Sequence, residues 1–159
     1  MKKVYKYRKK LPLEQGKKYL FYFQKKVFLS GDVEYFVAID PFGDKHLIPT
    51  EHYTAYHLKT GEKYLCKVDK INCLGRIFIE PPHPFFEEGE SYAFRYLKTI
   101  QKKHKSGNIY SYHLFEDKKG EKALMNADDF VLDEHLKSGF HLFRVEKITK
   151  GRIFIGCDL

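Results

Sequence analysis

The pentapeptide GRIFI occurs twice in this chain, at 75–79 and again at 151–155. The match extends backwards: YLCKVDKINCLGRIFI (64–79) aligns with HLFRVEKITKGRIFI (141–155), with one residue lost before the glycine. Gly75 and Gly151 are 76 positions apart, a longer period than solenoid repeats have. The sequence therefore predicts that one small domain has been duplicated, with GRIFI as its last strand.

Each copy has the same predicted order of elements. Tyr19, Phe21 and Phe23 alternate with other residues, which is the period of a strand with one buried face. Between the third and fourth strands, TEHYTAYHLKTG and ADDFVLDEHLKSG each begin with a capping residue and acids and end on glycine, which predicts a short helix. Strands are predicted at 19–23, 33–40, 45–49, 63–71 and 76–80, and in the second copy at 92–96, 109–116, 122–126, 140–148 and 152–155.

Three strands, a helix and two more strands are the elements of an OB-fold. The predicted fold class is therefore all-β with one short helix per repeat, arranged as two tandem five-stranded OB-fold barrels. The predicted boundaries are a basic N-terminal arm at 1–13, the first barrel at 14–80, a Pro-rich linker at 81–88 and the second barrel at 89–159.

Two segments of the first copy resemble the S-one type RNA-binding domain, a family first described in a ribosomal protein. HLKTGEKYLCKVDKINCLGRIFIEP (57–81) is similar to the end of that domain, where a Leu-Lys-x-Gly step precedes a strand, a turn and an Arg-Ile-x-Leu strand. YFVAIDPFGDKHLIP (35–49) resembles its second and third strands. The resemblance implies an OB-fold and RNA binding. It also implies that the family's exposed histidine corresponds to His46 or, after a shift of three residues, to the position of Pro49.

The positive charge is concentrated at the start of the chain. Residues 1–26 hold ten Lys or Arg and one acid, whereas the other 133 residues hold 19 basic and 20 acidic groups. Such a local field is typical of an arm that binds a polyanion, although a solubilising tail would have the same composition.

Several classes of protein find no support in the sequence. The three cysteines (Cys66, Cys73 and Cys157) have no CxxC spacing, so neither a disulfide framework nor a zinc site is predicted. We find no Gly-rich phosphate loop and no nucleophile motif, so neither an enzyme nor a cofactor is predicted. The longest apolar run is too short to span a membrane, and a cytoplasmic protein is expected.

Alternation predicts which side chains lie on the barrel surface. If Val37 faces the core, Phe36 faces outward, as does its equivalent His113. In the closing strand the same rule places Arg76 beside Phe78, and the loops between the first two strands carry lysines in both copies. Core packing is the alternative for each aromatic residue, and a solvated hairpin tip for the lysines. The predicted nucleic-acid-binding residues are Tyr22, Lys25, Lys26, Phe36, His46, Arg76, Phe78, Arg95, Lys98, Lys102, Lys103, Lys105, His113 and Arg152.

The leading hypothesis is a non-catalytic protein that binds RNA, or single-stranded DNA, through basic loops and exposed aromatic residues. The alternative hypothesis is a protein-interaction adaptor with no nucleic-acid role. The near-neutral body of the chain after residue 26 favours that alternative.

Overall fold

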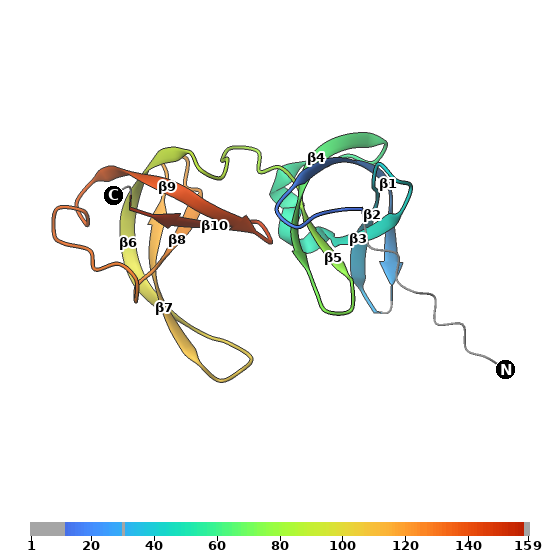
Figure 1. Cartoon of the computed structure of the whole chain (residues 1–159). Helices are drawn as coiled ribbons and strands as arrows, with labels where there is room; N and C mark the ends of the chain where they lie inside the picture. The colour runs from blue at the N-terminus through green and yellow to red at the C-terminus, as the bar shows by residue number, and fades with distance from the viewer. Residues whose placement is uncertain (1–11, 30, 158–159) are drawn as a thin grey trace. The chain divides into compact units, whose positions relative to one another are not determined.

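The chain divides into two compact units, Met1–Pro82 and His83–Leu159, and β-strands are the main secondary structure of the described residues in each (Figure 1). The computed structural model describes residues 12–29 and 31–157. Nearly all of the predicted basic arm lies outside these ranges. Within them, no helix is both long enough and apolar enough to cross a bilayer.

The first unit is a five-stranded antiparallel sheet with the order β3-β2-β1-β4-β5. β1 pairs with β4 through its first half and with β2 through its second half, with a register shift between Phe23 and Lys25. Such a bulge bends the strand, so that β1 serves both sides of the sheet. The elements are β1 (Lys18–Leu29), β2 (Val33–Ile39), β3 (Lys45–Pro49), the 3₁₀-helix η1 (Thr50–Tyr56), β4 (Glu62–Ile71) and β5 (Ile77–Glu80).

The second unit repeats this order and closes into a barrel. Its long first strand has the same shift, here between Tyr96 and Lys98. The last strand pairs in parallel with the third strand and antiparallel with the fourth, which gives the closed order β10-β8-β7-β6-β9. The strands are β6 (Ser91–Lys103), β7 (Ile109–Glu116), β8 (Lys122–Asn126), β9 (Phe140–Thr149) and β10 (Arg152–Gly156).

Two residues that were predicted outside the barrels complete the two cores. Leu13, from the predicted arm, is 2 % exposed in the first core, and Phe86, from the predicted linker, is 4 % exposed in the second. The residue just after each of them makes the same hydrogen bond. The Tyr19 hydroxyl accepts a hydrogen bond from the Glu14 N–H, and the Tyr92 hydroxyl accepts one from the Glu87 N–H, both at 3.0 Å. Each repeat therefore begins a few residues earlier than its first strand.

The prediction of one helix per repeat holds only for the first unit. Residues 127–139 of the second unit form turns instead. There, Asn126 Oδ1 accepts the Asp128 N–H at 2.9 Å, and Asp133 Oδ1 accepts the Leu136 N–H at 2.8 Å. The Asn126 bond starts a turn where the helix was expected to begin. Asp133 instead caps a single helical turn, since its carbonyl oxygen also accepts a hydrogen bond from the Lys137 N–H at 3.1 Å.

The first hairpin of each unit is longer than predicted, because backbone pairing continues to Leu29↔Val33 and to Lys103↔Ile109. In the second unit this hairpin extends beyond the rest of the barrel (Figure 1). The prediction that the lysines lie in loops is therefore wrong for those in β1 and β6, namely Lys25, Lys26, Lys98, Lys102 and Lys103. Of the predicted set, Lys105 alone lies at a hairpin tip.

Candidate binding face

In strands β2 and β7, the side chains that were predicted to face outward face the core instead. Phe36 is 4 % exposed, and its ring centroid lies 5.3 Å from that of Phe23. The equivalent residue, His113, is 8 % exposed. The prediction that Phe36 and His113 face outward is therefore wrong. The run YFVAI (35–39) is apolar throughout, so alternation alone does not decide which side faces the core.

His46 anchors a turn and is not an exposed contact residue. Its Nε2 lies 2.8 Å from Asp40 Oδ2, and its ring packs edge-on against Phe21. The other oxygen of Asp40 accepts hydrogen bonds from the backbone N–H groups of Phe42 and Asp44. The Asp40 carboxylate thus fixes the β2–β3 turn, and His46 is held against it. The expected exposure of His46 is therefore also wrong.

His113, itself buried, is part of a hydrogen-bond chain that runs out to the surface. Its Nε2 lies 3.0 Å from the carbonyl oxygen of Phe130, which can only accept, so Nε2 carries the hydrogen. In the neutral ring, Nδ1 then accepts from the Thr99 hydroxyl at 2.8 Å, and the Tyr96 hydroxyl donates to the same Thr99 oxygen at 2.8 Å. This chain ties the 127–139 segment to the barrel, which gives His113 a structural role.

The opposite, outer side of the second unit carries a continuous row of basic and apolar side chains. Strand pairing places five residues side by side across β6, β7, β8, β10 and β9: Lys98, Leu114, Leu124, Phe154 and Lys147. Neither leucine belongs to the core cluster, as strand alternation requires. Tyr112 lies two residues before Leu114 on β7, and its ring centroid is 6.3 Å from that of Phe154.

The first unit has the corresponding residues in two separate runs, because β3 and β5 do not pair in its sheet. Lys25 pairs with Val37, Val37 pairs with Leu47, and Lys70 pairs with Phe78. The predicted neighbour of Phe78 is also in place, since the Arg76 guanidinium lies 4.9 Å from the Phe78 ring centroid. We call the seven positions that hold identical residues in both units the shared outer face. They are Lys25, Tyr35, Lys45, Leu47, Lys70, Arg76 and Phe78, and Lys98, Tyr112, Lys122, Leu124, Lys147, Arg152 and Phe154.

The structure brings some of the predicted site residues onto this side of the sheets. Tyr22 and Arg95 occupy equivalent outer positions, opposite Ile39 and Glu116. The outer side of the sheets holds Tyr22, Lys25, Arg76 and Phe78 in the first unit, and Arg95, Lys98, Lys102 and Arg152 in the second. Alternation places Lys103 on the other side of its hairpin, and Lys26 lies over the ring of the core residue Phe36 at 5.2 Å.

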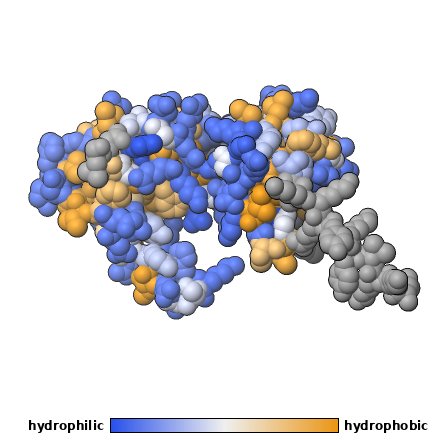
Figure 2. Space-filling model, viewed as in Figure 1, coloured by the Kyte–Doolittle hydropathy of each residue, from blue (hydrophilic) through white to orange (hydrophobic). Residues whose placement is uncertain are grey.

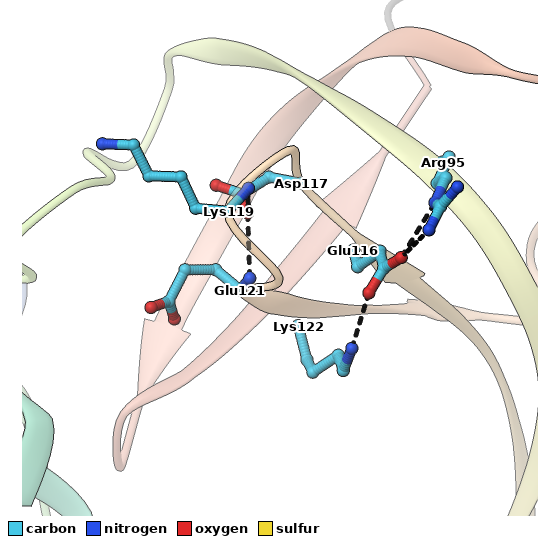
Figure 3. Close-up of polar contacts among 6 residues, drawn as sticks. All are labelled: Arg95, Glu116, Asp117, Lys119, Glu121 and Lys122. Atoms are coloured by element: carbon cyan, nitrogen blue, oxygen red, sulfur yellow. Dashed lines mark hydrogen bonds and ion pairs between the residues drawn. The ribbon is translucent and has the colours of Figure 1, made fainter.

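The shared outer face is cationic in both units. Among the described residues, Lys25, Lys45, Lys70 and Arg76 have no acidic partner in the first unit, and neither do Lys98, Lys147 and Arg152 in the second. The exception is Lys122, whose Nζ lies 2.7 Å from Glu116 Oε2. Hydrogen bonds from Lys122 and then from Arg95 lower the pKa of the Glu116 carboxyl below its ordinary value (Figure 3).

Sequence reasoning missed nine of the fourteen residues of the shared outer face. They are Tyr35, Lys45, Leu47 and Lys70 in the first unit, and Tyr112, Lys122, Leu124, Lys147 and Phe154 in the second. The signal that would have found them is identity between the copies at positions outside the core. Figure 2 shows why composition alone gives no such signal, because hydrophilic residues cover most of the visible face and hydrophobic residues form only small patches.

Comparisons with family models, with curated proteins and with solved structures find no match for this chain. The described ranges also contain no group of three or more His, Cys, Asp or Glu side chains that could hold a metal ion. The chemistry of the candidate site is therefore that of its rings and cations.

Proposed function

We propose that the protein is a tandem OB-fold protein related to the S-one type domains, and that it binds RNA or single-stranded DNA without catalysis on the shared outer face of each unit. The observation that carries this proposal is the recurrence of the same tyrosine, phenylalanine and cations on one side of both sheets.

The strand order supports the OB-fold assignment. In both units the first strand pairs with the second and fourth strands and the fifth strand pairs with the fourth; in the second unit the fifth strand also pairs with the third. OB-folds bind oligonucleotides on the face of strands 2 and 3, between the loop that joins strands 1 and 2 and the loop that joins strands 4 and 5. The shared outer face includes that surface, and Arg76 and Arg152 lie at the second of these loops.

The residue types fit a flexible strand with exposed bases. Tyr112 and Phe154 offer two rings on one surface, and Lys98 and Lys147 flank them at the two ends of the row. Bases stack on aromatic rings with about 1–3 kcal/mol per base, and the cations neutralise phosphates. A duplex hides its bases, so this surface favours single strands.

Fluorescence anisotropy with a labelled 30-nucleotide poly(U) tests the proposal. Tyr112→Ala together with Phe154→Ala is expected to weaken binding at least tenfold, since two stacked bases are lost at about 1 kcal/mol or more each. Phe42→Ala is the matched control, because it removes an exposed ring from the β2–β3 turn, outside this face. Absence of binding at low micromolar protein in 50 mM salt would refute the proposal.

One observation favours protein docking as a second candidate function. The first hairpin of the first unit has an exposed apolar end, in which Phe28, Leu29 and Val33 are 67 %, 44 % and 42 % exposed. The corresponding hairpin of the second unit is rich in lysine instead. If this end docks a protein, partners recovered with the intact chain persist after nuclease treatment and are lost with Phe28→Ser and Leu29→Ser.

A further inference from the structure

Arg95 is held in place from two directions. Its Nε and Nη2 both donate to Oε1 of Glu116, while Lys122 donates to Oε2 of the same carboxylate (Figure 3). The guanidinium also lies over the ring of Phe140, with 5.7 Å between its central carbon and the ring centroid. An arginine fixed by a carboxylate and a ring loses little further side-chain entropy when it binds a ligand.

The arrangement leaves one edge of the guanidinium available. All hydrogen bonds of Arg95 to other described residues come from Nε and Nη2, so Nη1 and the second N–H of Nη2 make none. The Arg95 side chain is 51 % exposed. Lys118 also lies over the Phe140 ring, at 5.8 Å. With Lys122, these groups carry three positive charges against the single negative charge of Glu116.

We propose that this cluster is a preformed site for a phosphate group, with Arg95 as the bidentate donor and with Glu116 and Phe140 as positioning residues. Two parallel N–H groups of arginine match two oxygens of a phosphate. On the outer side, Arg95 and Glu116 form the next pair after Lys98 and Leu114, with the inward-facing pair of Tyr96 and Phe115 between them, so the phosphate would sit beside the ring-bearing row. The inference deepens the proposed function, because the backbone or the end of a bound strand supplies the phosphate.

The site is specific to the second unit. The positions of Arg95 and Glu116 are occupied in the first unit by Tyr22 and Ile39, and that of Phe140 by Lys63. The two shared outer faces therefore differ in this neighbouring row. We infer that the second unit holds a strand phosphate in a fixed place, whereas the first unit has neither the arginine nor the carboxylate that would position it there.

The decisive test uses Glu116→Gln, because bulk electrostatics and positioning predict opposite results. Removal of a negative charge strengthens binding of a polyanion if only net charge matters. If Glu116 positions Arg95, the same change weakens binding of poly(U), by about tenfold for one charge-assisted hydrogen bond. Glu134→Gln is the matched control; it removes a charge from an exposed residue outside the cluster and should change the affinity less than twofold.

Arg95→Lys tests whether the paired N–H groups of the guanidinium matter in addition to its charge. Lysine keeps the positive charge but cannot form two parallel bonds, so affinity should fall about tenfold with little change in salt dependence. Thermal unfolding of each variant shows that the fold is kept. Unchanged affinity in both Arg95→Lys and Glu116→Gln, or tighter binding by Glu116→Gln, overturns the phosphate site.

Two further measurements identify the phosphate and separate this inference from the proposed function. If the site takes a terminal phosphate, a 5′-phosphorylated strand binds more tightly than its 5′-hydroxyl form and Arg95→Lys abolishes the difference; equal affinities assign the site to backbone phosphates. Pyrophosphate is titrated while the Arg95 Nε–H signal is followed by NMR. A shifted signal with no strand binding would refute the proposed function and leave the phosphate site standing. If the signal does not shift, and the strand binds equally well to the wild type and to Arg95→Lys, the phosphate site is refuted and the proposed function stands.

Discussion

The strongest prediction concerns the salt dependence of strand binding. Seven cations of the shared outer faces have no acidic partner among the described residues, four in the first unit and three in the second. At about 0.7 log unit per phosphate contact, a strand that covers both units gives a log–log salt slope of about −5. Replacement of Lys98, Lys147 and Arg152 by glutamine should reduce this slope to about −3.

These slopes differ enough to be measured by anisotropy with 30-nucleotide poly(U). From 50 to 200 mM KCl, wild-type affinity should fall about a thousandfold and that of the triple variant about fiftyfold. The control replaces Lys59, Lys119 and Lys137, which carry the same total charge but lie outside the sheets. Equal slopes for the wild type and the triple variant, with a reduced slope for the control, would show that phosphates do not lie on the shared outer face.

Three further predictions concern stability. Tyr53→Phe removes a buried hydrogen bond of 2.7 Å to Glu80 and should lower the free energy of unfolding by about 2–3 kcal/mol in urea titrations; a change below about 0.5 kcal/mol would contradict this. Asp40→Ala should lower the free energy of unfolding by about 3 kcal/mol, and Asp117→Ala should lower it by about 1–2 kcal/mol. The reason is that Asp40 contacts His46 and two backbone N–H groups, whereas Asp117 accepts hydrogen bonds from two backbone N–H groups only. Equal losses would show that the His46 contact contributes nothing. Burial lowers the pKa of His83 to about 4, so the unfolded chain binds more protons, and His83 favours the fold less as pH falls from about 6.5 to about 4. Relative to His83→Asn, which keeps an acceptor for the Phe85 and Phe86 N–H groups, the wild type should lose about 1–2 kcal/mol over that range after allowance for solvent screening, and parallel pH profiles would refute this.

The positions of the strands were predictable because the same order of strand and turn signals occurs in both halves of the sequence. For example, DPFGD and DKKGE both predict a turn after the second strand. In both turns the carboxylate of the first aspartate accepts a hydrogen bond from a backbone N–H two residues later. The helix of the second copy was not predictable in this way. Residues 127–139 have the same pattern of acids and a final glycine as the helix of the first copy. That pattern does not reveal the hydrogen bonds that Asn126 and Asp133 make to nearby backbone N–H groups.

The side each residue faces was harder to predict than its strand. In β1 the alternation of Tyr19, Phe21 and Phe23 gave the correct face, although Leu20 and Tyr22 lie between them and only the flanking residues are polar. The register shift after Phe23 then changes the phase, so Lys25 faces outward with Tyr22. A bulge leaves no mark in hydrophobic periodicity.

The two sides of these sheets differ between the units in different ways. On the inner side, contacting residues have changed together: Tyr53 and Glu80, which share a hydrogen bond, correspond to Phe130 and Gly156. Loss of the hydroxyl with the carboxylate avoids a buried charge that lacks its donor.

On the outer side, seven residues are unchanged. Substitution of an exposed residue usually alters stability by less than about 0.5 kcal/mol, so folding alone does not require the four cations, which are exposed in both units. The proposed function accounts for their recurrence, because each unit would contact phosphates and bases with the same cations and rings. A protein partner with one docking site would engage one unit and leave the other free to change.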